Sequence, residues 1–237
     1  MVYVIQVEGN IGVGKTTLIK SLKNELQTYK NIIYLFEPID KWTNMQDINL
    51  LQMYYKDKKK YAELFQTYAF ITLLKKHLLY NFKNNDDIII CERSLLTSIH
   101  IFGQILLKEQ SIRPIFQKTL LECYTTFHED ILKPNVIIYI KVKNEDIPKI
   151  LKKRIATRNR KGESEEIPTD YLLKLNEVYE KLIHNDIYKH YDGVKVIEIP
   201  MMNNHSNEID TYLKEIRNHI DAYRNKTKRN RTQSLNL

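Results

Sequence analysis

The sequence predicts an α/β fold in which a five-stranded parallel sheet carries helices on both faces. Runs rich in Ile, Val and Tyr alternate along the chain with longer helix-like segments, and a glycine-rich loop follows the first run. The apolar residues of these runs are nearly continuous, as expected for parallel strands that are covered on both faces. The strand-like runs are residues 2–7, 31–37, 86–92, 135–141 and 194–199.

The segments between the strand-like runs are long enough to form crossover helices, which parallel strands require. In sheets of this kind, ligands bind outside the carboxyl ends of the strands. Residues 157–168 are polar and charged and contain a glycine, so we interpret them as an exposed lid between two helices. The predicted helices are residues 16–30, 59–82, 94–108, 112–132, 144–156, 169–190 and 207–224.

The glycine-rich loop has the pattern GxxxxGK[ST] and stands between a strand and a helix, which is the context in which this motif binds nucleotide phosphates. Its backbone N–H groups and the helix N-terminus favour an anion. In such loops the lysine reaches the terminal phosphates and the hydroxyl ligates Mg²⁺. A plain glycine turn is the alternative interpretation. The predicted phosphate-binding residues are Gly9, Asn10, Ile11, Gly12, Val13, Gly14, Lys15, Thr16 and Thr17.

Charged residues follow the second and third strands. Glu37 ends the second strand-like run, and Glu92 and Arg93 end the third. A carboxylate at this edge can accept a proton from an attacking hydroxyl or hold Mg²⁺, and an arginine can stabilise a moving phosphoryl group. A helix cap or a surface salt bridge is the alternative for one glutamate. Two carboxylates beside an arginine favour the catalytic interpretation.

The helix predicted at residues 59–82 and the segment before it carry residues suited to a nucleobase and a sugar. The amide of Gln66 can form two hydrogen bonds with a base edge, and Phe65 can stack on a base or pack in the core. Tyr54 and Tyr55 offer hydroxyl groups upstream. Arginines beside the lid suit phosphate binding, although a solvated helix face is the alternative for them. These arginines are Arg154, Arg158 and Arg160.

Composition bounds the class of protein. The chain has 237 residues, of which 43% are hydrophobic, and a formal net charge of +8. No apolar run approaches the roughly 18 residues of a membrane span, and the chain begins with a strand, so we expect a cytoplasmic protein without a membrane partner. Residues 225–237 are basic, and we predict a disordered, solvated tail there rather than a nucleic-acid arm. Cys91 and Cys123 are expected to be free thiols.

The motifs GNIGVGKTT, EPIDKW, LQMYY, FQTYA, ERS, KRIATRNR and IPTDYLLKLN occur in one order over residues 1–200, and this set resembles the deoxynucleoside kinase family. The resemblance implies a three-layer P-loop kinase fold with a lid, in a domain of residues 1–224. It also implies ATP as phosphate donor, Mg²⁺, a deoxynucleoside acceptor and a homodimer. The reaction would be transfer of the γ-phosphate to the 5′-hydroxyl, in nucleotide salvage for DNA synthesis.

The resemblance also implies roles for individual residues. Glu37 would be the general base on the 5′-hydroxyl, and Arg93 would contact the transferring phosphate together with Lys15. Glu92 would hold Mg²⁺ with Thr16, although Glu92 is a second candidate for the base. The three arginines beside the lid would close over the ATP phosphates.

The acceptor pocket is assigned in the same way. Gln66 would contact the base edge, while Tyr55 and a lid glutamate would hold the sugar 3′-hydroxyl. Glu163 is our choice for that glutamate, with Glu165 and Glu166 as alternatives, because the lid is one residue longer than the family pattern. Residues expected to frame the base are Trp42, Tyr54, Phe65, Ala69, Leu73, Ser98 and Phe102.

The expected substrate preference depends on two of these positions. Family members that accept purines or prefer deoxycytidine carry an arginine and an aspartate where this chain has Leu73 and Ser98. Without that pair the pocket resembles those of thymidine-accepting members. We therefore expect a pyrimidine deoxynucleoside, thymidine first and deoxycytidine second.

Two other functions share part of this pattern. Thymidylate kinase has the same fold class, but it usually has an arginine before the Glu-Pro of the second strand, where this chain has Phe36. A nucleotide-dependent nucleic-acid-binding protein would use the loop and the basic tail, but it leaves Glu37, Gln66 and Tyr55 unexplained.

Overall fold

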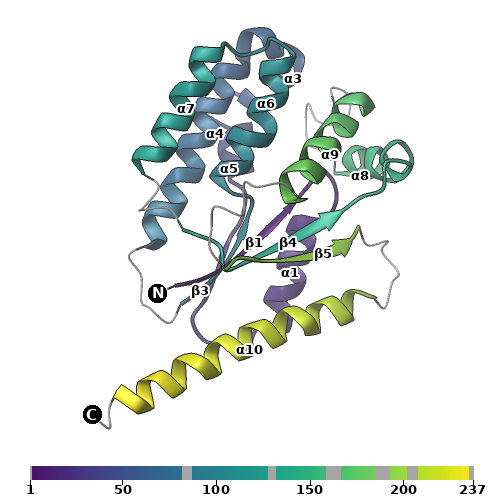
Figure 1. Cartoon of the computed structure of the whole chain (residues 1–237). Coiled ribbons are helices and arrows are strands. Elements are labelled where there is room, and N and C mark those ends of the chain that lie inside the picture. Colours follow the sequence, from purple (N-terminus) through teal and green to yellow (C-terminus); the bar gives the residue numbers. More distant parts are fainter. Residues whose placement is uncertain are drawn as a thin grey trace.

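A computed structural model describes residues 2–81, 87–127, 132–158, 167–184, 193–201 and 208–234 of the chain. Its five strands form one all-parallel sheet in the order β2-β3-β1-β4-β5, as the sequence predicted (Figure 1). The strands are β1 Tyr3–Gly9, β2 Ile32–Leu35, β3 Ile88–Glu92, β4 Val136–Lys141 and β5 Lys195–Pro200.

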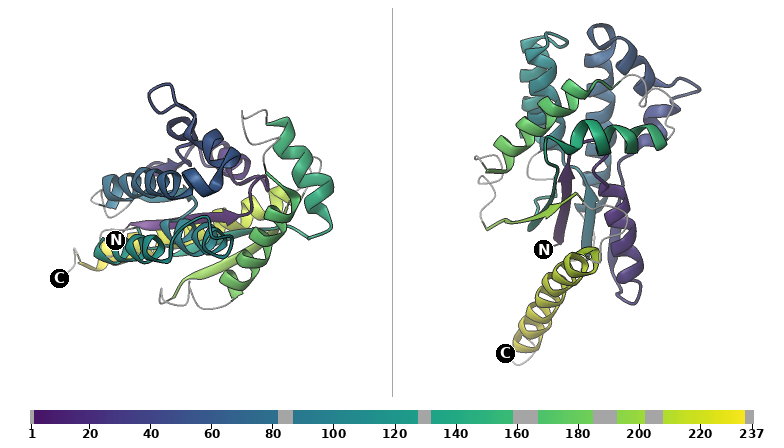
Figure 2. Two further views of the ribbon diagram at one scale, coloured as in Figure 1. Left: turned by 90° about the horizontal axis from the view of Figure 1, so that it is seen from above. Right: turned by 90° about the vertical axis from the view of Figure 1, so that its right-hand side faces the viewer.

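Helices connect the strands and cover the sheet. Figures 1 and 2 show α10 on the far side of the molecule from α4 and α7, and α10 packs beside α1. The helices are α1 Lys15–Glu25, α2 Ile39–Thr43, α3 Leu50–Lys56, α4 Lys58–Asn81, α5 Leu95–Thr97, α6 Gln104–Lys108, α7 Pro114–Thr126, α8 Lys152–Thr157, α9 Thr169–His184 and α10 Glu208–Ser234, with π-helical turns at Ser98–Gly103 and Ile147–Leu151.

Both faces of the sheet are buried, which explains the continuous apolar runs. Ile5 and Val7 of β1 belong to the large apolar cluster that includes Leu18 of α1. The alternate residue Val4 packs with Ile89 in a second cluster on the other face. Successive side chains of a strand point to opposite faces, so one strand serves both layers.

The predicted helices differ from the structure in three places. The short helices α2 and α3 were missed, since each is too brief for a clear helical period. The helices predicted at 94–108 and 144–156 are each interrupted by a π-helical turn, Ser98–Gly103 and Ile147–Leu151. In the first turn, the side-chain amide of Gln117 donates a hydrogen bond to the carbonyl oxygen of Ile99 (2.7 Å).

The third difference concerns the basic tail. Residues 225–237 were predicted to be disordered, but α10 continues to Ser234. No glycine or proline follows Pro200 in the sequence, so nothing in the local chemistry ends this helix early. The prediction weighed charge alone and did not weigh the lack of helix-ending residues in this segment.

Strand order brings distant parts of the chain to one edge. β3 lies between β1 and β2, and all three strands point the same way. The glycine loop after β1, Glu37 after β2 and Arg93 after β3 therefore meet at the carboxyl edge. On the other side of β1, Gly9 approaches β4 closely: its φ is +140°, and a Cβ there would lie 2.7 Å from the carbonyl oxygen of Ile140.

The cysteines, the membrane-span expectation and the predicted lid can each be compared directly with the structure. Cys91 is buried and Cys123 is partly buried, and both are free thiols. Among the helices in the part of the chain that the structure describes, none is both long and apolar enough to cross a bilayer. Most of the predicted lid, including Arg160, Glu163, Glu165 and Glu166, lies outside the described residues.

Candidate active site

The glycine loop is held firmly from several sides. The Lys15 ammonium donates hydrogen bonds to the carbonyl oxygens of Gly9 (3.1 Å) and Asn10 (2.9 Å). The Asn10 amide donates to the carbonyl oxygen of Leu172 in α9 (2.8 Å), so Asn10 braces the loop rather than pointing toward a ligand. Arg154 reaches the loop at the Val13 carbonyl oxygen (3.4 Å). The loop is thus preformed for an anion.

Lys15 is a buried lysine that is 4% exposed. Burial and, to a smaller extent, the positive charge of Arg93 together lower the pKa of its ammonium to about 7, while Glu92 and Glu37 oppose the shift. A phosphate group placed beside Lys15 would favour the charged form. The free protein therefore contains, near neutral pH, a mixture of charged and neutral Lys15 that an anionic ligand would convert to the charged form.

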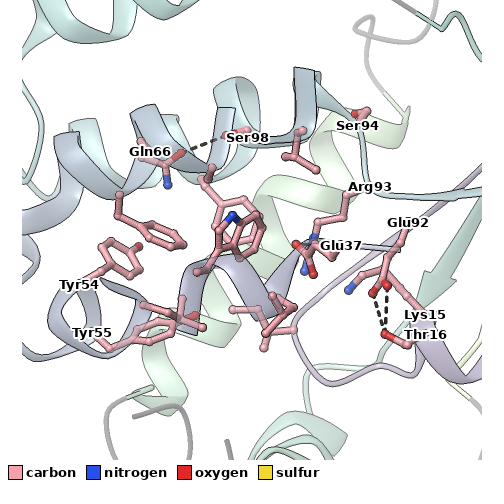
Figure 3. A pocket seen from close by; sticks show the side chains of 18 of the residues that line it. Lys15, Thr16, Glu37, Tyr54, Tyr55, Gln66, Glu92, Arg93, Ser94 and Ser98 are labelled. Atoms are coloured by element: carbon pink, nitrogen blue, oxygen red, sulfur yellow. Dashed lines mark hydrogen bonds and ion pairs between the residues drawn. The ribbon is translucent and has the colours of Figure 1, made fainter. Parts of the chain in front are cut away.

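Thr16 and Glu92 lie together at the start of α1 and the end of β3. The Thr16 hydroxyl lies 2.9 Å from Oε1 and 3.0 Å from Oε2 of Glu92 (Figure 3). A hydroxyl and a carboxylate are hard oxygen ligands of the kind that Mg²⁺ prefers. Within the described residues, no cluster of three His, Cys, Asp or Glu side chains could hold a metal by itself. This pair therefore suits an ion that shares its coordination with phosphates and water.

Glu37 and Arg93 form an ion pair between the glycine loop and the pocket that follows it. Nε of Arg93 lies 2.8 Å from Oε1 of Glu37, although its N–H is not aligned for a hydrogen bond. Arg93 is 4% exposed and adopts a left-handed backbone conformation with φ of 63°. Its guanidinium stacks over the ring of Phe102 (5.0 Å). Strained backbone at a buried arginine is typical of functional sites.

A pocket of about 730 Å³, including solvent at its mouth, extends from the glycine loop to α4. At its far end the Ser98 hydroxyl donates a hydrogen bond to Oε1 of Gln66 (3.1 Å), and both residues are buried (Figure 3). The pocket therefore has phosphate-binding groups at one end and an oriented amide at the other, with Glu37 and Arg93 between them.

The wall of the pocket is aromatic. The ring of Phe65 stacks on Tyr54 (4.6 Å between ring centres) and meets Trp42 edge to face (5.5 Å). The Tyr54 hydroxyl shares a hydrogen bond with Tyr171 of α9 (3.2 Å), and the Trp42 indole donates to Thr72 (2.9 Å). These polar tips are occupied within the protein, so the two rings present apolar surface to a ligand.

The structure brings most of the predicted site residues to this pocket. Thr17 is exposed on α1, and Val13 packs in the apolar core. Of the lining residues, Ile39, Leu51 and Ser94 were not predicted as site residues, because apolar residues and helix caps carry no signal of their own. The predicted residues that line the pocket are Ile11, Lys15, Thr16, Glu37, Trp42, Tyr54, Tyr55, Phe65, Gln66, Ala69, Leu73, Glu92, Arg93, Ser98, Phe102 and Arg158.

The glycine loop between β1 and α1, with carboxylates and an arginine on the neighbouring strand ends, defines a P-loop phosphotransferase. The chain belongs to the deoxynucleoside kinase family: the sequence profile described as "Deoxynucleoside kinase" matches residues 5–221. It is thus an ATP-dependent deoxynucleoside kinase by family, and the fold agrees with that family's α/β architecture.

The relatives of this chain are kinases, and those named for a substrate differ in the nucleoside. Protein 029R of Invertebrate iridescent virus 3, whose name describes it as a kinase without a substrate, is 36% identical over 76% of this chain and 82% of its own length. Fowlpox virus FPV151, named as a probable deoxycytidine kinase, is 33% identical over 82% of this chain and 77% of its own. Human mitochondrial thymidine kinase 2 is 28% identical over 82% of this chain and 70% of its own.

Lys15 generates a prediction about proton uptake. Because its pKa is lowered to about 7, most Lys15 side chains are neutral amines at pH 8. They should gain a proton when MgATP binds, and the expected uptake is about 0.9 proton per site. At pH 6 the uptake by Lys15 should fall to about 0.1, since the group is already charged. Calorimetric titrations in buffers of different ionisation enthalpy measure this number.

Two variants make the measurement specific. Lys15→Arg keeps the charge but cannot take up the proton, so its uptake at pH 8 should be near zero. Lys20→Met removes an exposed lysine of the same helix and should retain the uptake. Equal uptake at pH 8 by the wild-type protein and Lys15→Arg would contradict the assignment.

Proposed function

We propose that the protein transfers the γ-phosphate of ATP to the 5′-hydroxyl of a pyrimidine deoxynucleoside, with thymidine preferred over deoxycytidine. One observation carries the proposal: a single pocket joins the phosphate-binding loop to the buried Gln66 amide, and the Glu37–Arg93 pair lies between them. A nucleoside with its base at Gln66 would direct its 5′-hydroxyl toward Glu37.

In the proposed reaction, positioning and electrostatics supply most of the catalysis. Glu37 accepts the proton of the 5′-hydroxyl as that oxygen attacks the γ-phosphorus. Lys15 and Arg93 neutralise the charge of the phosphoryl group during transfer. Arg158, which lines the pocket, and Arg154, which contacts the glycine loop, are suited to the remaining phosphates.

The proposal includes Mg²⁺, for which Thr16 and Glu92 are the protein ligands. Their oxygen atoms already lie within 3.0 Å of each other. When bound with ATP, the ion would offset phosphate charge and help to orient the triphosphate. Using Glu92 in this way leaves Glu37 as the base.

Base recognition is proposed to depend on Gln66. Its amide can pair with the N3 and O4 edge of thymine or the N3 and N4 edge of cytosine. The hydrogen bond from Ser98 to Oε1 fixes the plane of the amide. The buried residues Ala69 and Leu73 add apolar surface beside it, which suits the methyl group of thymine. The names of the relatives, which include thymidine, deoxycytidine and deoxyguanosine kinases, do not decide the preference.

The sugar is proposed to lie beside Tyr55, which lines the pocket near Tyr54. Its hydroxyl is suited to the 3′-hydroxyl of the deoxyribose. The lid glutamate that would share this contact, Glu163 or one of its neighbours, stays a prediction outside the described residues.

Thymidylate kinase is the alternative enzyme. A monophosphate acceptor needs a cation beside its phosphate, whereas the residue before Glu37 is Phe36, which packs against the apolar core. Arg93 is already paired with Glu37 and stacked on Phe102. These observations favour an acceptor without a phosphate.

A substrate panel tests the proposed function. Thymidine, deoxycytidine, deoxyadenosine, deoxyguanosine and thymidine monophosphate are each assayed with ATP and Mg²⁺ under steady-state conditions. We expect thymidine to give the highest kcat/KM, deoxycytidine the second, and the purines values at least about 10-fold lower, because the larger bases do not fit the apolar wall. A purine with the highest kcat/KM would overturn the preference, and phosphorylation of the monophosphate alone would overturn the acceptor class.

We also propose a homodimer. Large apolar side chains on α4 are exposed, including Leu64 (53%), Ile71 (54%) and Leu79 (58%), and Ile115 of neighbouring α7 is 63% exposed. The bidentate contact of Arg113 with Glu63 joins the start of α7 to α4. An exposed apolar surface formed by two helices is suited to association with a second copy of the chain.

Sedimentation or light scattering tests the dimer. The wild-type protein should have twice the mass of the chain, and Ile71→Glu should give monomers, since it would place a charge in the interface. Ile48→Glu changes an exposed apolar residue outside α4 and α7 and should stay dimeric. A monomeric wild-type protein at micromolar concentration would contradict the proposal.

A further inference from the structure

Glu8 is a buried carboxylate with no part in the proposed reaction. It lies in β1 directly before the glycine loop and has no solvent exposure. Its Oε1 accepts a hydrogen bond from the Thr97 hydroxyl (2.6 Å). Burial raises the pKa of this carboxyl group, and the neighbouring Arg93 lowers it. A buried acid is costly unless charged or polar groups satisfy it, so its partners indicate what it does.

Tyr179 connects Glu8 to Arg93. It lies in α9, the helix that follows the lid, and is fully buried. The Tyr179 hydroxyl donates to Oε2 of Glu8 (3.4 Å) and accepts a hydrogen bond from Nη1 of Arg93. One hydroxyl thus uses its proton toward the carboxylate and its lone pair toward the guanidinium, an arrangement that fixes the position of both.

Arg93 is therefore held from two sides by different kinds of contact. Nε faces Glu37, which must release its contact with the arginine in part when it accepts a proton. Nη1 faces Tyr179 and the carbonyl oxygen of Gly9 (3.1 Å), and neither of these groups reacts. If Glu37 were the only anchor, the guanidinium would lose its orientation at the moment when the phosphoryl group needs it.

We propose that Glu8 and Tyr179 are positioning residues that hold the Arg93 guanidinium in its catalytic orientation while Glu37 takes the proton of the acceptor. This inference rests on the proposed role of Arg93 in phosphoryl transfer.

Tyr179→Phe is the test, because it removes the hydroxyl and keeps the ring. With thymidine and MgATP, kcat should fall about 10-fold, as expected for a lost hydrogen bond to a charged group. Both KM values should change less than about twofold, because the interaction acts in the transition state. A merely structural role of the ring would not produce this separation of kcat from KM.

Tyr139→Phe is the matched control. Tyr139 is a second buried tyrosine whose ring stacks on Tyr179 (5.9 Å between ring centres), and its hydroxyl donates to Glu180 (3.0 Å), away from Arg93. This variant loses one hydroxyl from the same cluster and should keep kcat within about twofold of wild type. Thermal unfolding of both variants shows whether each is folded.

A double-mutant comparison tests the connection to Glu8. If the hydroxyl acts through the chain of contacts, Glu8→Gln combined with Tyr179→Phe should lower kcat no more than the larger single effect. Arg93→Lys, which keeps the charge and loses the fork geometry, should lower kcat more than about 100-fold.

Arg93→Lys and Tyr179→Phe together distinguish the positioning inference from the proposed role of Arg93 in phosphoryl transfer. If Arg93→Lys lowers kcat while folded Tyr179→Phe stays within twofold of wild type, the positioning inference is wrong and the proposed role of Arg93 stands. If Arg93→Lys keeps its kcat, both are overturned. A rise in KM with unchanged kcat for Tyr179→Phe also overturns the inference.

Discussion

The ion pair between Arg93 and Glu37 is the interaction on which the rest of the site depends. Arg93 is almost completely buried, and such a cation is tolerated only when anions and hydrogen-bond acceptors surround it. Burial lowers the pKa of the guanidinium, but Tyr179 and the three carboxylates together raise it above its usual value and so stabilise the charged form; the carboxylates are Glu37, Glu8 and Glu92. The carboxylates therefore stabilise the buried guanidinium, and the guanidinium in turn stabilises the negative charges of the carboxylates.

Parallel strand order makes this charge group possible. Glu8 precedes the glycine loop in β1, and the sheet order, with β3 between β1 and β2, brings Arg93 and Glu37 from the ends of the other two strands to the same edge. The donor and acceptor ends of one pocket therefore share the same charges.

Much of this could be predicted because it is local in the sequence. The strands follow from continuous apolar runs, and the placement of Lys15 and Glu37 at the carboxyl edge of the sheet follows from their position after a strand. The contact of Tyr179 with Arg93 could not be found in this way, because it joins residues 86 positions apart and depends on how α9 packs. The π-helical turn at Ser98 and Phe102 depends likewise on Gln117 of α7, and α10 extends to Ser234 because no residue ends it.

The central claim is that Glu37 leaves Arg93 to accept the proton of a deoxynucleoside 5′-hydroxyl. The most direct measurement is kcat for thymidine phosphorylation by Glu37→Gln, which keeps the shape of the side chain and removes the base. The account predicts a fall of about 10²–10⁴-fold, with the protein still folded and MgATP still bound. An unchanged kcat would contradict the account and would move the role of base to Glu92.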